Sequence, residues 1–194
     1  MDDSQVMTDA HTANKASIEP VRRAMVDFDE RNVRAVLATV VSADAVVHMP
    51  YPFGDLIGPD TLYDTCYAPL LDAMPDLERR DWIVVGGVTE RGDKWVGCGG
   101  HYIGTFIGPW LDIPPTGHLT HMRFHEFYRF EEGQVVEIQT LWDIPEVMIQ
   151  ARAWPLGQSS RASLLRSHRH HAAVHEKTPR PRRPRGDGNA PFLE

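Results

Sequence analysis

The spacing of apolar residues predicts helices in the first part of the chain and mainly strands in the second. Apolar positions recur at helical intervals in a segment that begins near Ser17, in a second over 33–40 and in a third over 58–74. The β-branched run at 45–51 is typical of a strand. Residues 1–16 are polar without periodicity, so we expect a disordered lead-in there.

Four strands are expected next, because apolar and polar residues alternate and Gly or Pro marks the turns. They cover residues 77–86, 94–106, 120–130 and 134–142. A last helix begins at Asp143, where an Asp cap, a Pro in the first turn and Glu146 form a capping box. This order predicts an α+β fold: a cone-shaped α+β barrel in which N-terminal helices wrap a curved antiparallel sheet around an internal pocket.

Charge divides the 194 residues into two regions. Residues 1–156 hold 12 Lys and Arg against 24 Asp and Glu, and residues 157–194 hold 8 against 3. We expect one folded domain at 17–156 and a disordered tail, rich in Arg, Pro and His, at 157–194. The acidic domain would repel phosphate backbones, so nucleic acid is not an expected partner, and only the tail could bind one.

Several classes of site and location are disfavoured. No apolar run of about 18 residues could span a membrane, no signal peptide begins the chain, and two cysteines are too few for a disulfide framework, which favours a reduced, cytoplasmic protein. The glycine motifs of nucleotide-cofactor sites and the serine-hydrolase elbow are absent, so nucleotide cofactors and serine hydrolysis are disfavoured. Arg interrupts the tail histidines, and no metal site is predicted. Within the run Gly97–Gly100, glycine marks a bend or the close approach of a ligand.

Glu126 is the strongest candidate for chemistry. Met122, Phe124, Tyr128 and Phe130 share its face of the strand, so it is the one charged group on an apolar face. An unpaired carboxylate there should have a raised pKa and could exchange protons near neutral pH. The structural alternative is a carboxylate that bonds an Arg or Tyr in the wall.

Other candidates surround the same predicted pocket. His48 and His101 could complete an acid/base set with Glu126, although a single His on a strand is more often a core residue. Thr140 could orient a substrate or bond the backbone, and Asp143 could bind substrate or only cap its helix. Aromatic side chains supply flat apolar surface for a planar ligand, or simply core. They include Tyr51, Tyr102, Trp110 and Trp142.

The residues resemble those of the SnoaL-like polyketide cyclases, within the group that shares the cone fold of nuclear transport factors. The resemblance rests on the stretches 56–78, 100–117 and 123–150 and covers about 18–156. It implies a homo-oligomer with one conical pocket per subunit and intramolecular aldol ring closure by side-chain acid/base groups, without metal or cofactor. Thr140 stands where the family has its acid/base Asp, and Glu126 where it has a His.

Together these observations predict a cofactor-independent enzyme in which Glu126 moves a proton on a hydrophobic, polyketide-like carbonyl compound. Cyclisation, isomerisation, dehydration and hydrolysis share that step. The alternative is a non-catalytic ligand-binding or dimerisation module, whose interior would be filled by side chains. A dimer is expected on the exposed sheet face, where charged residues accompany an aromatic one. These residues are His121, Arg123, Phe127 and Arg129.

Overall fold

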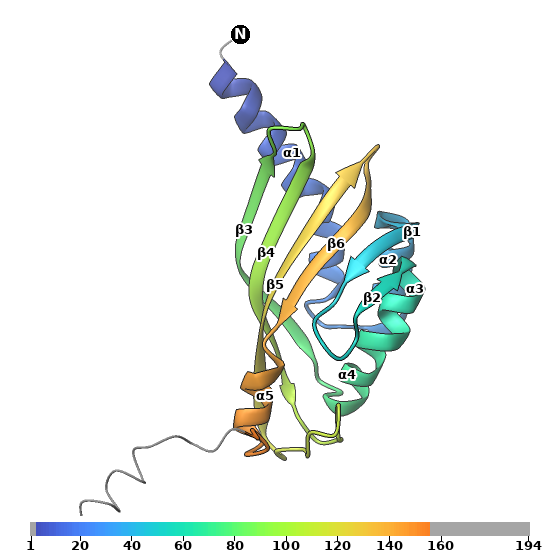
Figure 1. The fold of residues 1–194 in the computed structure, drawn as a ribbon, viewed down its shortest axis with the longest axis vertical. Helices are drawn as coiled ribbons and strands as arrows, with labels where there is room; N and C mark the ends of the chain where they lie inside the picture. The colour runs from blue at the N-terminus through green and yellow to red at the C-terminus, as the bar shows by residue number, and fades with distance from the viewer. Residues whose placement is uncertain (1–2, 156–194) are drawn as a thin grey trace, which may run out of the picture. The chain divides into compact units, whose positions relative to one another are not determined.

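The computed structural model describes residues 3–155, which form a six-stranded sheet with helices on one face (Figure 1). The strands are β1 Val41–His48, β2 Asp55–Ile57, β3 Glu78–Val88, β4 Lys94–Thr105, β5 Leu119–Glu131 and β6 Gln134–Trp142. The helices are α1 Asp3–Ala24, α2 Glu30–Val40, α3 Gly58–Leu62, a π-helical turn Tyr63–Tyr67, α4 Ala68–Ala73 and α5 Ile144–Gln150. The predicted tail at 157–194 lies outside the described residues. Within the described part, no helix has the length and apolarity needed to cross a bilayer.

Helices α1 to α4 cover one face of the sheet, which we call the inner face; the opposite one is the outer face (Figure 1). The apolar stripes found in the sequence form the contact: Met25 and Phe28 of the first segment, Leu37 of the second and Leu70 of the third are all buried. The predicted α+β fold is confirmed. The sheet is curved and open, with strand order β2-β1-β6-β5-β4-β3.

The first helix is longer than the sequence predicted. It begins at Asp3 instead of near Ser17, so residues expected to form a disordered lead-in are helical, and Pro20 lies inside the helix. Part of the reason is a contact with β3 that apolar periodicity does not reveal. A Cβ atom at Gly86 would lie 2.8 Å from the backbone oxygen of His11, so the glycine allows the helix backbone to approach the strand.

The sheet also departs from a purely antiparallel arrangement. Strand β1 starts at Val41, four residues before the predicted run, and it pairs in parallel with β6. The short strand β2, which the sequence did not predict, pairs with the other edge of β1. The remaining neighbours are antiparallel.

Alternation in β5 is confirmed residue by residue. Thr120, Met122, Phe124, Glu126, Tyr128 and Phe130 are buried on the inner face. The residues between them in the sequence lie on the outer face. There the glycine run of β4 has no side chains and makes room for those of the adjacent strands. Cβ atoms at Gly97 and Gly99 would lie 2.9 Å from atoms of Phe127 and Ile83. Side chains of neighbouring strands therefore occupy the space that these glycines leave.

Helix α5 completes an exposed edge of β5. Strand β6 ends at Trp142, opposite Phe124, so earlier residues of β5 pair with β4 on one edge and have no strand of the described part on the other. Side chains of α5 replace it: Gln150 bonds the backbone N–H and C=O of His121, and Glu146 accepts the backbone N–H of Arg123 at 3.0 Å. These contacts explain why a helix with Glu146 and Gln150 on the side of β5 follows the last strand directly.

Candidate active site

Glu126 lies on the inner face of β5, and its carboxylate accepts hydrogen bonds from four side chains. Oε1 accepts from the Tyr102 hydroxyl at 2.8 Å and the Trp142 indole N–H at 3.0 Å. Oε2 accepts from Nη1 of Arg79 at 2.6 Å and from the Tyr128 hydroxyl. The side chain has no exposed surface. Glu126 therefore has the partners of the structural alternative, an Arg and Tyr side chains in the wall.

Arg79, the cation of this cluster, was missed in the sequence. It comes from β3, directly opposite Tyr102 on β4, and is buried, with its guanidinium 4.2 Å from the centre of the Phe124 ring. Two arginines are adjacent in the chain, Arg79 and Arg80, and alternation requires one of them to point inward. The available signal was the need of a buried carboxylate for a cation.

The partners reverse the pKa shift that was expected for Glu126. Burial by itself raises the pKa, but the charge of Arg79 and the hydrogen bonds from Tyr128, Trp142 and Tyr102 outweigh it, and the pKa lies below its ordinary value. The predicted rise in the pKa of Glu126 is therefore wrong. Alternation shows that the carboxylate lies on the inner face, but it does not show which groups donate hydrogen bonds to it. Burial raises the pKa of both phenols well above the ordinary range, so they remain protonated donors.

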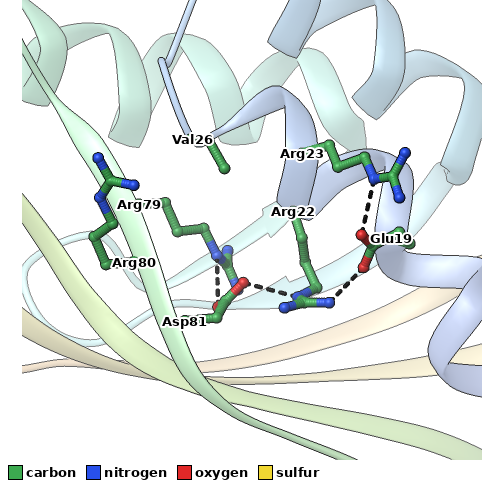
Figure 2. A pocket seen from close by; sticks show the side chains of 7 residues that line it. All are labelled: Glu19, Arg22, Arg23, Val26, Arg79, Arg80 and Asp81. Carbon is green, nitrogen blue, oxygen red and sulfur yellow. Dashed lines mark hydrogen bonds and ion pairs between the residues drawn. The ribbon is translucent and has the colours of Figure 1, made fainter.

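Arg79 also links the buried carboxylate to the surface. Its Nε donates to Asp81 at 3.1 Å, and the other oxygen of Asp81 accepts from Nε of Arg22 at 2.8 Å. Arg22 in turn bonds Glu19 one turn away on α1. Figure 2 shows these side chains between helix and strand. The guanidinium is thus held from two directions, by Asp81 on one edge and Glu126 on the other.

Aromatic rings fill the inner face around the ion pair. Adjacent ring centres are 4.8 to 6.4 Å apart. The cluster consists of Phe28, Phe53, Tyr63, Tyr67, Tyr102, Trp110, Phe124 and Trp142. In this closed form a ligand can reach Glu126 only after one of these side chains moves.

Three buried polar groups at this cluster have no hydrogen-bond partner among the described residues. They are the Tyr63 hydroxyl, Nη2 of Arg79 and Nε1 of Trp110. All three can donate, and a buried donor without an acceptor costs about 1–3 kcal/mol. The inner face therefore has spare donors that oxygen atoms of a ligand or of water could satisfy.

The two predicted histidines do not join Glu126. His48 pairs with Gln139 across the strands, on the outer face, and its Nδ1 lies 2.8 Å from Asp55. His101 is also on the outer face, where its Nδ1 accepts the indole N–H of Trp82 at 3.2 Å. Burial lowers the pKa of His101. The sheet thus separates both imidazoles from the carboxylate.

The predicted binding residues fall into several environments. Tyr102, Trp110 and Trp142 belong to the buried cluster, whereas Tyr51 is 92% exposed on the loop after β1. Thr140 is directly opposite Glu126 on the inner face, and its hydroxyl donates to the His48 carbonyl at 3.2 Å.

Asp143 has the cap geometry predicted from the sequence: Oδ1 accepts the backbone N–H of Glu146 at 3.1 Å. It also borders a surface cavity of about 290 Å³ on the sheet. That cavity is lined by Arg123, His125, Leu141, Trp142, Asp143 and Pro145.

The site can do two things chemically. It presents a carboxylate with a guanidinium and phenols, which can move a proton if a ligand displaces one donor, and it presents spare donors that can polarise a carbonyl oxygen. Within residues 3–155, no group of three His, Cys, Asp or Glu side chains is placed to hold a metal ion. The two free cysteines, Cys66 and Cys98, are buried, which raises the pKa of each thiol to about 12.

The chain matches one protein-family model, and its fold is similar to that of several solved structures. The family model described as SnoaL-like polyketide cyclase matches residues 19–151. No curated protein matches the chain by sequence.

Three solved structures illustrate the shared fold. A proposed SnoaL-like polyketide cyclase from Jannaschia sp. CCS1 is 21% identical with a TM-score of 0.62, covering 75% of this chain and 96% of its own. AclR, a proposed hydroxylase from Streptomyces galilaeus, is 19% identical with a TM-score of 0.61, covering 86% and 99%. An NTF2-like protein from Burkholderia thailandensis is 16% identical with a TM-score of 0.54, covering 72% and 95%.

Proposed function

Because this chain belongs to the SnoaL-like polyketide cyclase family, we propose that it is an enzyme that moves a proton on a hydrophobic, polyketide-like carbonyl compound at the inner face. The observation that carries the proposal is the buried cluster around Glu126. It joins a carboxylate, a guanidinium and two phenols to two further donors without acceptors, the Tyr63 hydroxyl and Nε1 of Trp110, inside an aromatic wall. Reaction types that begin with proton removal next to a carbonyl include aldol cyclisation, isomerisation and dehydration.

The spare donors define how the substrate would lie. A carbonyl oxygen that accepts the Trp110 indole N–H or the Tyr63 hydroxyl would satisfy a buried donor and would make the neighbouring C–H more acidic. The rings of Tyr67 and Trp142, with centres 5.6 Å apart, offer an apolar surface beside it. The binding free energy then comes from ring contact and from donors that are unsatisfied in the free protein.

Glu126 is the proposed proton acceptor. In the closed form its basicity is reduced by four donors, so substrate must displace one, for which the hydroxyl of Tyr102 or Tyr128 is suited. The freed oxygen takes the proton from the carbon next to the carbonyl, and the enolate carbon attacks a second carbonyl of the same molecule. The proton then returns from Glu126 to the new alkoxide, which balances the step.

Hydrogen–deuterium exchange tests this chemistry without knowledge of the natural substrate. The probe is 1-tetralone, a bicyclic ketone, followed by NMR in D₂O with the full chain. We expect the protein to accelerate exchange next to the carbonyl, and Glu126→Gln to lower that acceleration by about 10²–10⁴-fold, measured where circular dichroism shows the variant folded. The matched control is Glu137→Gln on the outer face, which should retain the wild-type rate.

A second candidate is a non-catalytic module, favoured by the complete burial of Glu126 within filled aromatic packing. Such a module would bind the ketone, seen as quenching of tryptophan fluorescence, without accelerating exchange, or would bind nothing. Binding without exchange would reject the enzyme and support a ligand-binding role. Exchange that survives in Glu126→Gln would remove this carboxylate from the mechanism.

A further inference from the structure

A second concentration of charge lies on the surface side of Arg79, between α1 and β3 (Figure 2). A cavity of about 210 Å³ is lined there by Glu19, Arg22, Arg23, Val26, Arg79, Arg80 and Asp81. Residues 1–156 contain only 12 basic residues against 24 acidic ones. Four of the 12 therefore border one small cavity in a strongly acidic domain.

Arg79 has an unused donor on the side of this cavity. Nε bonds Asp81 and Nη1 bonds Glu126, while Nη2 has no acceptor among the described residues. In a planar guanidinium the Nε–H and Nη2 share one edge, and Nη1 points away from it. Asp81 lines the cavity and accepts from Nε, so the guanidinium edge that carries Nε and Nη2 is the edge on the side of Asp81. Nη2 is buried behind the lining and lacks the acceptor that buried N–H groups normally have.

The neighbouring arginine has a similar surplus. Arg22 uses Nε for Asp81 and Nη1 for Glu19, which leaves its Nη2 without an acceptor within residues 3–155. The lining thus has two carboxylates, Glu19 and Asp81, which together bond three arginines. Some guanidinium N–H groups of these arginines therefore have no acceptor among the described residues. The fourth, Arg80, pairs with Glu78 outside the lining.

We propose that this cavity binds a small oxyanion, a phosphate or carboxylate group, through Nη2 of Arg22 and, once the side chains that cover it shift, through Nη2 of Arg79. The volume has room for about seven water molecules at ~30 Å³ each, which suits such a group but not a polycyclic substrate. Guanidinium groups match the geometry of oxyanions and can donate to two oxygens at once. The site goes beyond the proposed function, since it needs no chemistry at Glu126.

Binding of three probes to the full chain tests the site at constant ionic strength in chloride: inorganic phosphate, glycerol 3-phosphate and acetate, by isothermal titration calorimetry. We expect saturable binding at one site for at least one probe. Tighter binding of glycerol 3-phosphate than of inorganic phosphate would identify the ligand as a phosphate group of an organic molecule. Tighter binding of inorganic phosphate would identify it as the free ion. Binding of acetate alone would identify a carboxylate group.

Two matched arginines locate the binding. Arg22→Gln should weaken it about tenfold or more, because a charge-assisted hydrogen bond contributes ~1.5–3 kcal/mol. Arg129→Gln should change it less than about twofold; Arg129 also bonds two carboxylates, and its side chain is 23% exposed against 25% for Arg22. The exposed Arg23→Gln, which should fold normally, is expected to weaken binding in the same direction as Arg22→Gln.

Three results would overturn the proposal. One is the absence of saturable binding for all three probes. Another is equal loss in the variants of Arg22 and Arg129. The third is binding that neither substitution changes, which would assign the oxyanion to the basic segment 157–194 instead.

Discussion

The two faces of the sheet surround their polar side chains differently. On the inner face, each oxygen of Glu126 accepts from two donors and neither Glu126 nor its partner Arg79 is exposed to solvent. On the outer face, Arg129 bridges Glu131 and Glu137 while all three side chains keep contact with water. The same kind of ion pair should therefore have a large effect on stability inside and a small one outside.

The comparison is most directly tested by removing the cation on each face. Arg79→Met leaves the buried carboxylate without its charge partner, so we expect a loss of about 3–5 kcal/mol in the free energy of unfolding. Arg129→Met should cost ~0–1 kcal/mol. Urea unfolding measures both. The double variant Arg79→Met with Glu126→Gln should recover most of the loss, and equal losses in the two single variants would contradict the proposed difference.

Acid provides a second test of the inner pair. The pKa of Glu126 is lowered in the folded protein, so the stabilisation it provides is present above the ordinary value of 4.5 and is lost as pH falls through the folded pKa. Wild type should therefore lose stability more steeply below about pH 4.5 than the double variant, which lacks this carboxylate. Parallel acid-unfolding curves for the two proteins would show that Glu126 does not contribute this dependence.

The sequence was sufficient to predict which face each residue of β5 occupies. Alternation placed Glu126, Tyr128 and Phe124 on one side of β5, and the family resemblance gave the fold. Alternation alone could not identify Arg79 as the partner of Glu126. The position of Arg79 beside Tyr102 depends on the register between β3 and β4, and the sequence of one strand does not determine that register. The face of His48 could not be predicted for the same reason. Its strand β1 pairs in parallel with β6, which begins at Gln134, 86 residues after His48.

A third test concerns what covers the outer face. Trp82, Phe127 and Leu141 are 57%, 45% and 60% exposed there, a concentration of apolar surface that commonly marks an interface. We expect a homodimer through this face, with Phe127→Asp raising its dissociation constant about tenfold or more while the unfolding free energy of the monomer stays near wild type. Analytical ultracentrifugation measures the dissociation constant of the dimer. A wild-type monomer at tens of micromolar would contradict this expectation.

The smallest effect is expected from the histidines of the outer face. His48→Asn and His101→Asn should each change the rate of ketone exchange less than about twofold, because the sheet lies between these imidazoles and the carboxylate and neither touches the buried cluster. In His101 the Nδ1 atom accepts the Trp82 N–H, so the neutral ring is favoured, in agreement with its lowered pKa. Its contribution to stability should be lost as pH falls, since protonation removes that acceptor. The exchange assay used for Glu126→Gln measures both variants. A hundredfold loss in either would mean that the imidazole reaches the substrate from the outer face, and the separation of the two faces would then not describe the chemistry of this domain.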